Sequence, residues 1–438
     1  MCDAATSYCT LGDVTDTNVE TLPENTPPNT RFRYIDLSAV EAGAINWSAV
    51  TETTFGAAPS RARRVLKSLD VLFGTVRPNR KSHGFIGPDN PGPFIASTGF
   101  SVVCGRDGVS HPGYLFHSLM SDHVTAQAVR DAIGSSYPAL NDSDVRRLQI
   151  FLPKYEEQQR ISQVLDTLDT AIHETEAIIV KLKAVKQGLL HDLLTRGIDA
   201  NGELRLPQTE APHLYKMSPL GWIPDEWNIL NLGYCAEISS GVTLGRMLTG
   251  HGLVQLPYLR VANVQDGYVD LSDVKTVQVL RNEVERFALA DGDVLMNEGG
   301  DYDKLGRGTV WRAQIQPCLH QNHVFRVRCN QDVLVPDYLA AFSASRRGKA
   351  FFIFSSKQST NLASINSTQL RSFPILCPHL PEQRQIIERL ASADGCVSVE
   401  EIELQKLREL KSALMDDLLT GRVRVTPLLT AENTPKSA

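Results

Sequence analysis

Two stretches of the chain carry apolar residues at alternating steps of three and four, which is the spacing of a coiled-coil seam. The first seam comprises Ile161, Leu165, Leu168, Ile172, Ile179, Leu182, Leu189 and Leu193. The second comprises Ile386, Leu390, Ala393, Val397, Leu404, Leu407, Leu414 and Leu418. Two further positions in each seam are polar, namely Thr175 and Lys186 in the first and Glu400 and Lys411 in the second. The pattern predicts two helices of about 38 residues, or about 57 Å each.

An internal duplication places these helices in the chain. The motif Pro-x-x-x-Glu-Gln-x-x-Ile occurs at residues 153–161 and again at 378–386, an offset of 225. The same offset relates residues 192–195 to 417–420, and it falls to 223 between residues 70–72 and 293–295. The chain therefore contains two copies of one unit, each a globular part followed by a long helix. Helices this long exceed one small domain, so we expect an antiparallel coiled coil with pseudo-two-fold symmetry; the alternative is a helix lying on its own domain.

Changes in composition give the expected boundaries. Globular parts occupy residues 1–150 and 231–375, and helical regions occupy 151–198 and 376–425. Residues 199–230 are rich in Pro and Gly and are typical of a linker, while 426–438 are expected to be a disordered tail. Short β-type runs alternate with helical stretches near 114–132 and 336–354, which indicates a mixed α/β (α+β) fold for each half.

Composition excludes several classes of protein. Apolar residues make up 42% of the 438 positions and charged residues 21%, which is ordinary for a folded protein. No stretch approaches the roughly 18 consecutive apolar residues of a membrane span, and residues 1–5 lack a signal-peptide pattern. The eight cysteines are scattered and form no Cys-x-x-Cys pair. We therefore expect reduced thiols in a cytoplasmic protein without a membrane partner.

The sequence shows no catalytic or metal-binding signature. It has no phosphate-binding Gly-x-x-x-x-Gly-Lys-Ser/Thr and no Asn/Asp-Pro-Pro-aromatic motif of amino-methyltransferases. His320 and His323 stand three residues apart, but no third ligand is placed to complete a zinc site. We therefore predict no catalytic residue, no metal site and no cofactor bound by this chain.

Positive charge gathers in two islands, although the net charge is −6. The first island, between residues 61 and 83, contains seven Lys and Arg residues and a single acid, Asp70. The second island lies between Asp337 and Glu382, where the sequence contains no acid. Such residues can neutralise phosphates, and Arg can also bind guanine through two hydrogen bonds. The candidates for contact with DNA are Arg77, Arg80, Lys81, His83, Lys304, Arg307, Arg346, Lys357, Gln358, Ser359 and Asn361. The alternative is that these are ordinary polar surface loops.

Several motifs resemble those of the DNA-specificity subunits of type I restriction-modification systems. They are the lead-in at residues 219–227, the strand at 292–295, residues 321–327 and the duplicated Glu-Gln motif. The resemblance covers about residues 11–425. The first copy departs from the pattern, because it lacks the Trp-rich lead-in and has Ser97-Thr98-Gly99 where the second has Gln321-Asn322-His323.

The resemblance implies that each globular half is a target-recognition domain reading one half of a bipartite, asymmetric DNA sequence. The helices would fix the spacing and dock two methyltransferase subunits, and restriction subunits would join them. The chain would be non-catalytic, with S-adenosylmethionine, Mg²⁺ and ATP used by its partners. Two alternatives are a specificity subunit of a methylation-only or phage-defence complex and a coiled-coil scaffold that binds proteins and not DNA.

Overall fold

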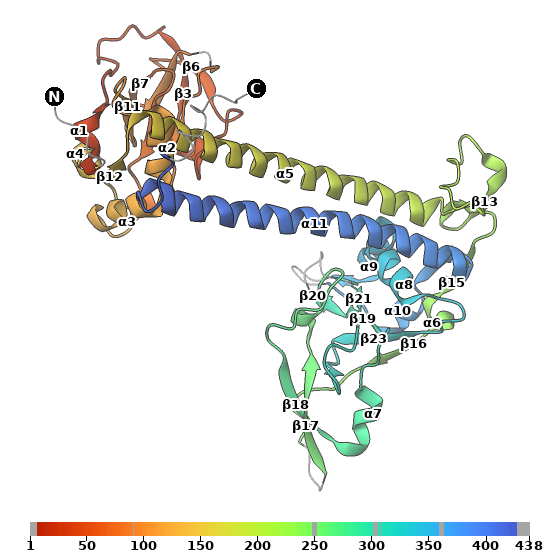
Figure 1. Cartoon of the computed structure of the whole chain (residues 1–438). Helices are drawn as coiled ribbons and strands as arrows, with labels where there is room; N and C mark the ends of the chain where they lie inside the picture. Colours follow the sequence, from red (N-terminus) through yellow and green to blue (C-terminus); the bar gives the residue numbers. More distant parts are fainter. Residues whose placement is uncertain are drawn as a thin grey trace, which may run out of the picture. The chain divides into compact units, whose positions relative to one another are not determined.

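The chain folds as two compact units, which Figure 1 shows in a computed structural model. The structure describes residues 7–90, 92–247, 252–300, 305–306, 308–358 and 363–426. Unit 1 consists of Met1–Ala177 and Glu401–Ala438, and unit 2 consists of Ile178–Glu400. Each unit therefore contains one globular half and a portion of both long helices. No helix in the described ranges is long and apolar enough to cross a membrane.

Unit 1 is built on two four-stranded sheets. One has the order β6 (Thr51–Thr54), β3 (Arg31–Ile35), β10 (Phe94–Ser97) and β7 (Ala62–Leu66). The other has the order β2 (Thr15–Thr17), β11 (Phe100–Gly105), β8 (Val71–Gly74) and β9 (Gly84–Phe85). Two strand pairs complete it, β1 (Ser7–Thr10) with β12 (Gln149–Leu152) and β4 (Val40–Glu41) with β5 (Ala44–Ile45). The helices are α1 (Leu11–Val14), α2 (Pro112–Met120), α3 (Asp122–Asp131) and α4 (Asp142–Arg147).

Unit 2 repeats this plan with additions. Its four-stranded sheet has the order β16 (Ala236–Ser240), β23 (Val324–Cys329), β19 (Val294–Asn297) and β21 (Gly308–Val310). One three-stranded sheet has the order β18 (Lys275–Leu280), β17 (Leu253–Leu259) and β22 (Leu319–His320). A second three-stranded sheet has the order β20 (Gly299–Gly300), β25 (Ala363–Ser364) and β24 (Lys357–Gln358). β13 (Tyr215–Ser218) pairs with β14 (Gly221–Pro224), and β15 (Asn228–Asn231) with β26 (Pro374–Cys377). The helices are α6 (Leu232–Cys235), α7 (Val284–Phe287), α8 (Pro336–Ala344), α9 (Arg346–Ser355) and α10 (Ser367–Arg371).

The mixed helix and strand content predicted for each half is confirmed. Each predicted helical stretch is divided in two by a serine that caps the second helix. Ser121 Oγ accepts a hydrogen bond from Val124 N at 3.3 Å at the start of α3, and Ser345 Oγ accepts one from Gly348 N at 3.2 Å at the start of α9. Serine at this position satisfies a free amide of the first turn, so the chain changes direction there in both units.

The two long helices are α5 (Tyr155–Thr195) and α11 (Leu380–Leu419), of 41 and 40 residues. All twenty predicted seam positions are buried or half-buried. The two seam lysines each bind an aspartate of the other helix, since Lys411 pairs with Asp169 in unit 1 and Lys186 with Asp394 in unit 2. These two ion pairs are related by the sequence offset of 225, and they explain why lysine interrupts both apolar seams at the same point.

Candidate nucleic-acid interface

All four predicted DNA-contacting residues of unit 1 lie in the loop between strands β8 and β9. The loop contains one 3-10 turn, η2 (Pro78–Arg80), between Arg77 and Lys81, whose φ angles of 51° and 48° are left-handed. Lys81 Nζ donates to Met120 O at 2.9 Å and pairs with Asp122 at 2.7 Å, which anchors the end of the loop. Arg80 is exposed, and its side chain has no partner among the described residues.

The first basic island is largely neutralised by acids that are remote in sequence. Four of its seven cations form ion pairs, which are Arg61–Asp36 at 2.9 Å, Arg64–Asp142 at 2.7 Å, Lys67–Glu20 at 3.0 Å and Lys81–Asp122 at 2.7 Å. Counting charges along the chain could not reveal these pairs. Within the described part of the chain, Arg77 and Arg80 are the predicted contacts of unit 1 that keep a charge without a carboxylate partner.

His83 requires a correction. Its side chain is only 1% exposed, its ring stacks on Phe73 with centroids 4.2 Å apart, and Nδ1 accepts a hydrogen bond from Gly74 N at 3.1 Å. Burial, together with the charge of Lys81, lowers the pKa of His83 to about 3, so the ring is neutral. A buried neutral imidazole reaches neither a phosphate nor a base edge. The prediction that His83 contacts DNA is therefore wrong, and the residue instead packs inside the domain.

In unit 2 the structure brings two of the predicted segments to one small sheet. Gly300 of β20 and Gln358 of β24 both pair with Ala363 of β25, which is the central strand of this three-stranded sheet. Strand β25 therefore has predicted contacts near both of its neighbours. On one side is β24, which contains Lys357 and Gln358, and on the other is β20, which precedes Lys304 and Arg307 in sequence. Lys304, Arg307, Ser359 and Asn361 lie outside the described residues, and their assignment stays a prediction.

Arg346 lies apart from that sheet, at the start of α9. It is exposed and lines a pocket of about 610 Å³ with Arg347, His191 and Thr195. Burial lowers the pKa of Arg347, and its Nη1 is buried without a hydrogen-bond partner in the described part of the chain. The neighbouring Lys349 pairs with Asp266 at 3.6 Å. The two arginines thus give this surface a positive charge.

The two histidines that raised the question of zinc do not form a joint site. His320 is fully buried, and its Nδ1 donates to Val324 O at 2.7 Å. Burial lowers its pKa to about 4. His323 lies 2.6 Å from a carboxylate oxygen of Glu298 through its own Nδ1. Each ring therefore has a separate partner and a separate environment.

Sequence reasoning missed the loop between Ile133 and Ala139 in unit 1. Its two large apolar side chains, Ile133 and Tyr137, are 77% and 69% exposed, and Arg77 lies over the Tyr137 ring at 4.4 Å from its centroid. The signal in the sequence is the internal duplication, because the offset of 225 aligns Ala139 with Ser364, close to the predicted Lys357–Asn361 segment. The first basic island predicts a role for Arg77 but does not indicate its contact with Tyr137.

The glutamine of each Glu-Gln motif anchors the start of a long helix to its own globular half. Gln158 and Gln383 both donate through Nε2 to two carbonyl oxygens and accept one backbone amide through Oε1. The partners are Val109 O, Pro153 O and His111 N for Gln158, and Val333 O, Pro378 O and Val335 N for Gln383, at 2.7–2.9 Å. Because both glutamines are buried, these bonds fix where α5 and α11 leave their domains.

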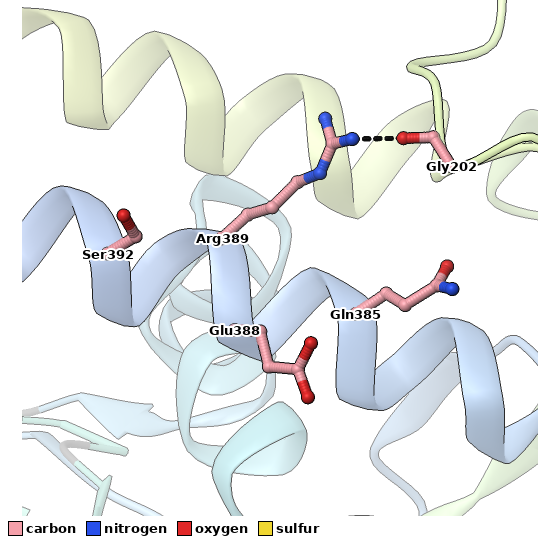
Figure 2. A pocket seen from close by; sticks show the side chains of 5 residues that line it. All are labelled: Gly202, Gln385, Glu388, Arg389 and Ser392. Carbon is pink, nitrogen blue, oxygen red and sulfur yellow. Dashed lines mark hydrogen bonds between the residues drawn. The ribbon is translucent and has the colours of Figure 1, made fainter.

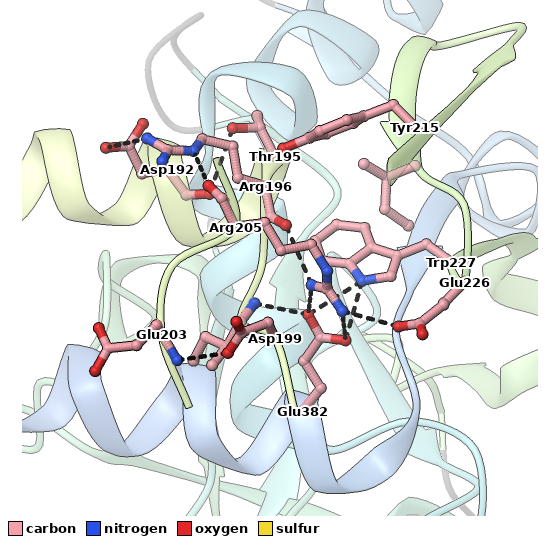
Figure 3. Close-up of polar contacts among 12 residues, drawn as sticks. Asp192, Thr195, Arg196, Asp199, Glu203, Arg205, Tyr215, Glu226, Trp227 and Glu382 are labelled. Atoms are coloured by element: carbon pink, nitrogen blue, oxygen red, sulfur yellow. Dashed lines mark hydrogen bonds and ion pairs between the residues drawn. The ribbon is translucent and has the colours of Figure 1, made fainter. Parts of the chain in front are cut away.

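The glutamate of each motif binds the chain that follows the other long helix. In unit 2, Glu382 binds the Arg205 guanidinium and accepts a hydrogen bond from Trp227 Nε1 (Figure 3). The bond from Trp227 is 3.1 Å long, and Glu382 also accepts one from Ile198 N at 2.8 Å. In unit 1, Glu157 accepts Arg424 Nε at 3.2 Å. The Gly197 turn, with φ 67°, passes close to Glu382, where a Cβ would lie 2.2 Å from its carboxylate. Each motif therefore joins both helices to one domain.

A pocket of about 310 Å³ lies beside this contact in unit 2. Gly202, Gln385, Glu388, Arg389 and Ser392 line it, and Arg389 donates to Gly202 O (Figure 2). This bond fastens the turn after α5 to the face of α11. The polar group that dominates the pocket is thus already engaged within the chain, and we assign the pocket a structural role.

A family comparison identifies the class of protein. The sequence model of the type I restriction modification DNA specificity domain matches residues 64–184 and 224–409, more than half of the chain. The chain therefore belongs to the family of type I restriction-modification DNA-specificity subunits, and it carries the family's domain twice.

Individual relatives agree with this assignment. The putative MjaX specificity subunit of Methanocaldococcus jannaschii is 25% identical over 48% of this chain and 49% of its own length. The EcoKI specificity subunit of Escherichia coli is 26% identical over 68% of this chain and 62% of its own. This chain thus spans about half the length of the first relative and less than two thirds of the second.

Solved structures show the same fold. A chain from a study of assembly and conformational transition of the type I R-M system is 25% identical, with a TM-score of 0.60, and the match covers 97% of this chain and 100% of that one. The type I S subunit from M. genitalium is 12% identical, with a TM-score of 0.53, over 96% of this chain and 98% of its own. At that identity the second likeness concerns the fold alone.

Proposed function

We propose that the chain binds double-stranded DNA as the specificity subunit of a type I restriction-modification complex, with each unit reading one half of a bipartite, asymmetric target. The observation that carries this proposal is the presence of two DNA-specificity domains in one chain. It is supported by the position of cationic residues, because both units place predicted DNA contacts beside the same small strand arrangement.

The long helices would set the spacing between the two half-sites. In this proposal α5 and α11 pair as an antiparallel coiled coil, and the two domains are related by a pseudo-two-fold axis. Support comes from the buried seam and from the paired contacts of Lys186 and Lys411, each with an aspartate of the other helix. The motif glutamates add to this, because Glu157 and Glu382 each bind the chain beyond the other helix.

The partners would be two methyltransferase subunits, docked mainly on the helical regions, and restriction subunits. Exposed apolar side chains outside the seam offer such a surface, among them Val180 at 69% and Val399 at 65% exposure. The chain itself would be non-catalytic, and S-adenosylmethionine, Mg²⁺ and ATP would be used by the partner subunits. The curated relatives, which are named as specificity subunits, support this division of labour.

Methylome sequencing tests the proposal directly. Cells expressing this chain with its methyltransferase subunit should show methylation at two short specific sequences separated by a fixed unspecified spacer. Cells expressing the methyltransferase subunit alone should lack the motif. Absence of any motif with both subunits present and folded would instead favour a scaffold that binds proteins and not DNA. A motif without DNA cleavage in the presence of restriction subunits would favour a methylation-only complex.

A further inference from the structure

The loop 133–139 of unit 1 is held in a defined shape at the protein surface. Ile133 and Ala139 exchange two backbone hydrogen bonds of 3.0 Å, and a second bridge joins Ala139 to Val76. Between these anchors, Tyr137 is 69% exposed, and the first anchor residue, Ile133, is 77% exposed. Large apolar side chains presented on an ordered loop are typical of a surface that contacts a partner.

Unit 2 has the same arrangement at the place predicted to contact DNA. There Ser364 is the central residue, and it pairs with Lys357 on one side and with Gly299 on the other. An offset of 225 relates Ala139 to Ser364, and an offset of 223 relates Val76 to Gly299. The offset of 225 relates Tyr137 to Leu362, the residue next to Asn361, which the sequence predicts to contact DNA. The loop 133–139 is therefore the unit 1 counterpart of the segment around Lys357 and Asn361.

Arg77 is fixed against this loop by three contacts. Its backbone N donates to Pro138 O at 2.7 Å, its Nη2 donates to Ser136 O at 3.1 Å, and its guanidinium lies 4.4 Å from the centroid of Tyr137. Its left-handed φ of 51° is costly for a residue with a side chain and is kept where surrounding contacts impose it. The other guanidinium donors of Arg77 have no partner among the described residues. Arginine stacked in this way keeps its planar fork oriented for two parallel hydrogen bonds.

We infer that Arg77 reads a base pair of the half-site bound by unit 1, and that Tyr137 is the positioning residue that orients its guanidinium. The inference rests on the proposed function and assigns the chemistry of one contact within it. Guanine is the base that suits the fork, because its O6 and N7 accept two parallel bonds in the major groove. A contact with phosphate alone would need the charge of Arg77 but neither its planar shape nor the stack on Tyr137.

Three variants of the full chain, each assembled with the methyltransferase subunit, separate these roles. Arg77→Lys keeps the positive charge and removes the planar guanidinium. Tyr137→Ala removes the aromatic ring that the guanidinium contacts, whereas Tyr137→Phe keeps that ring. Methylation of a library randomised over both half-sites should show that Arg77→Lys and Tyr137→Ala lose about tenfold or more discrimination at one guanine position. Tyr137→Phe should retain the wild-type preference. The other half-site serves as an internal control in every experiment.

Arg63→Lys is the matched control, because Arg63 also lies over an aromatic ring, Phe55 at 4.9 Å, but outside the loop. It should leave the motif unchanged. Equal preference in wild type, Arg77→Lys and Tyr137→Ala would overturn the inference while leaving the proposed function intact. Absence of a bipartite motif in the wild type would overturn the proposed function itself. The melting temperature of Tyr137→Ala should match that of the wild type. If Tyr137→Ala instead lowered the melting temperature and abolished recognition of the whole half-site, Tyr137 would be needed for folding and its positioning role would be refuted.

Discussion

The buried glutamates show how single residues connect distant segments within each unit. Glu157 is 2% exposed and receives hydrogen bonds from Arg424 and from Thr426 Oγ1, the latter at 2.7 Å. Burial acts to raise the pKa of Glu157, but the bonds from Arg424 and Thr426 outweigh it, so the pKa lies below its ordinary value. The carboxylate is therefore held in its charged form where the C-terminal segment meets the start of α5.

This contact predicts a pH-dependent contribution to stability. A carboxylate with a lowered folded pKa stabilises above its unfolded pKa, and the contribution disappears as the pH falls through the folded value. Glu157→Gln should cost about 1–3 kcal/mol of unfolding free energy at pH 7, toward the lower end because the Arg424 side chain is 37% exposed. The difference from wild type should shrink in acid. Denaturant unfolding at pH 7 and pH 3 measures both, with the exposed neighbour Glu156→Gln as the control. An equal loss at both pH values would contradict the ionic origin.

At the scale of elements, the sequence predicts what is local and periodic and misses what depends on remote partners. The seam and both long helices were predictable, because each rests on a repeat of three and four residues. The serine breaks at Ser121 and Ser345 were missed, because the apolar pattern continues across them. The first basic island was overestimated, since Arg64 meets Asp142 at a separation of 78 residues that no local count includes. The prediction for His83 fails for a similar reason, because the charged Arg80 and Lys81 precede it in sequence whereas its ring stacks on Phe73.

The proposed spacing role of the helices predicts the effect of lengthening them. Inserting seven residues after Ile179 and seven after Leu404, its repeat-equivalent, preserves the seam register in both helices. At about 1.5 Å per residue the insertions add about 10 Å, or about three base pairs at 3.4 Å each. Methylome sequencing should therefore show the same half-sites with a spacer about three base pairs longer. Inserting four residues after Ile179 alone disrupts the seam and should impair assembly or change the spacer. An unaltered spacer in the doubly lengthened protein would contradict the spacing role.

At the scale of the whole molecule, the net charge of −6 conceals the sign of the surfaces proposed to meet DNA. Five acids and no basic residue occupy the first 30 positions, and several cations of the first island are neutralised by ion pairs. Among the predicted DNA contacts whose side chains the structure describes, Arg77 and Arg80 in unit 1 and Arg346 in unit 2 have no carboxylate partner. Binding should therefore depend on few phosphate contacts, and its salt dependence should respond to single substitutions.

Two separate recognition domains in one chain predict independent effects on the two half-sites. Lys357→Ala/Gln358→Ala in unit 2 should relax the preference at one half-site only, whereas Arg77→Lys in unit 1 should relax the other. Because the substitutions lie in separate units, their combined effect on the free energy of binding should be the sum of the separate effects. Loss of the Lys357 charge should also reduce the slope of log affinity against log salt by about 1, and Arg77→Lys should leave that slope unchanged. Titration of the assembled complex with matched and half-mismatched DNA at several salt concentrations measures all three quantities. If either variant altered both half-sites equally, the two units would have to act on a single shared target, and the division of the bipartite sequence between them would be wrong.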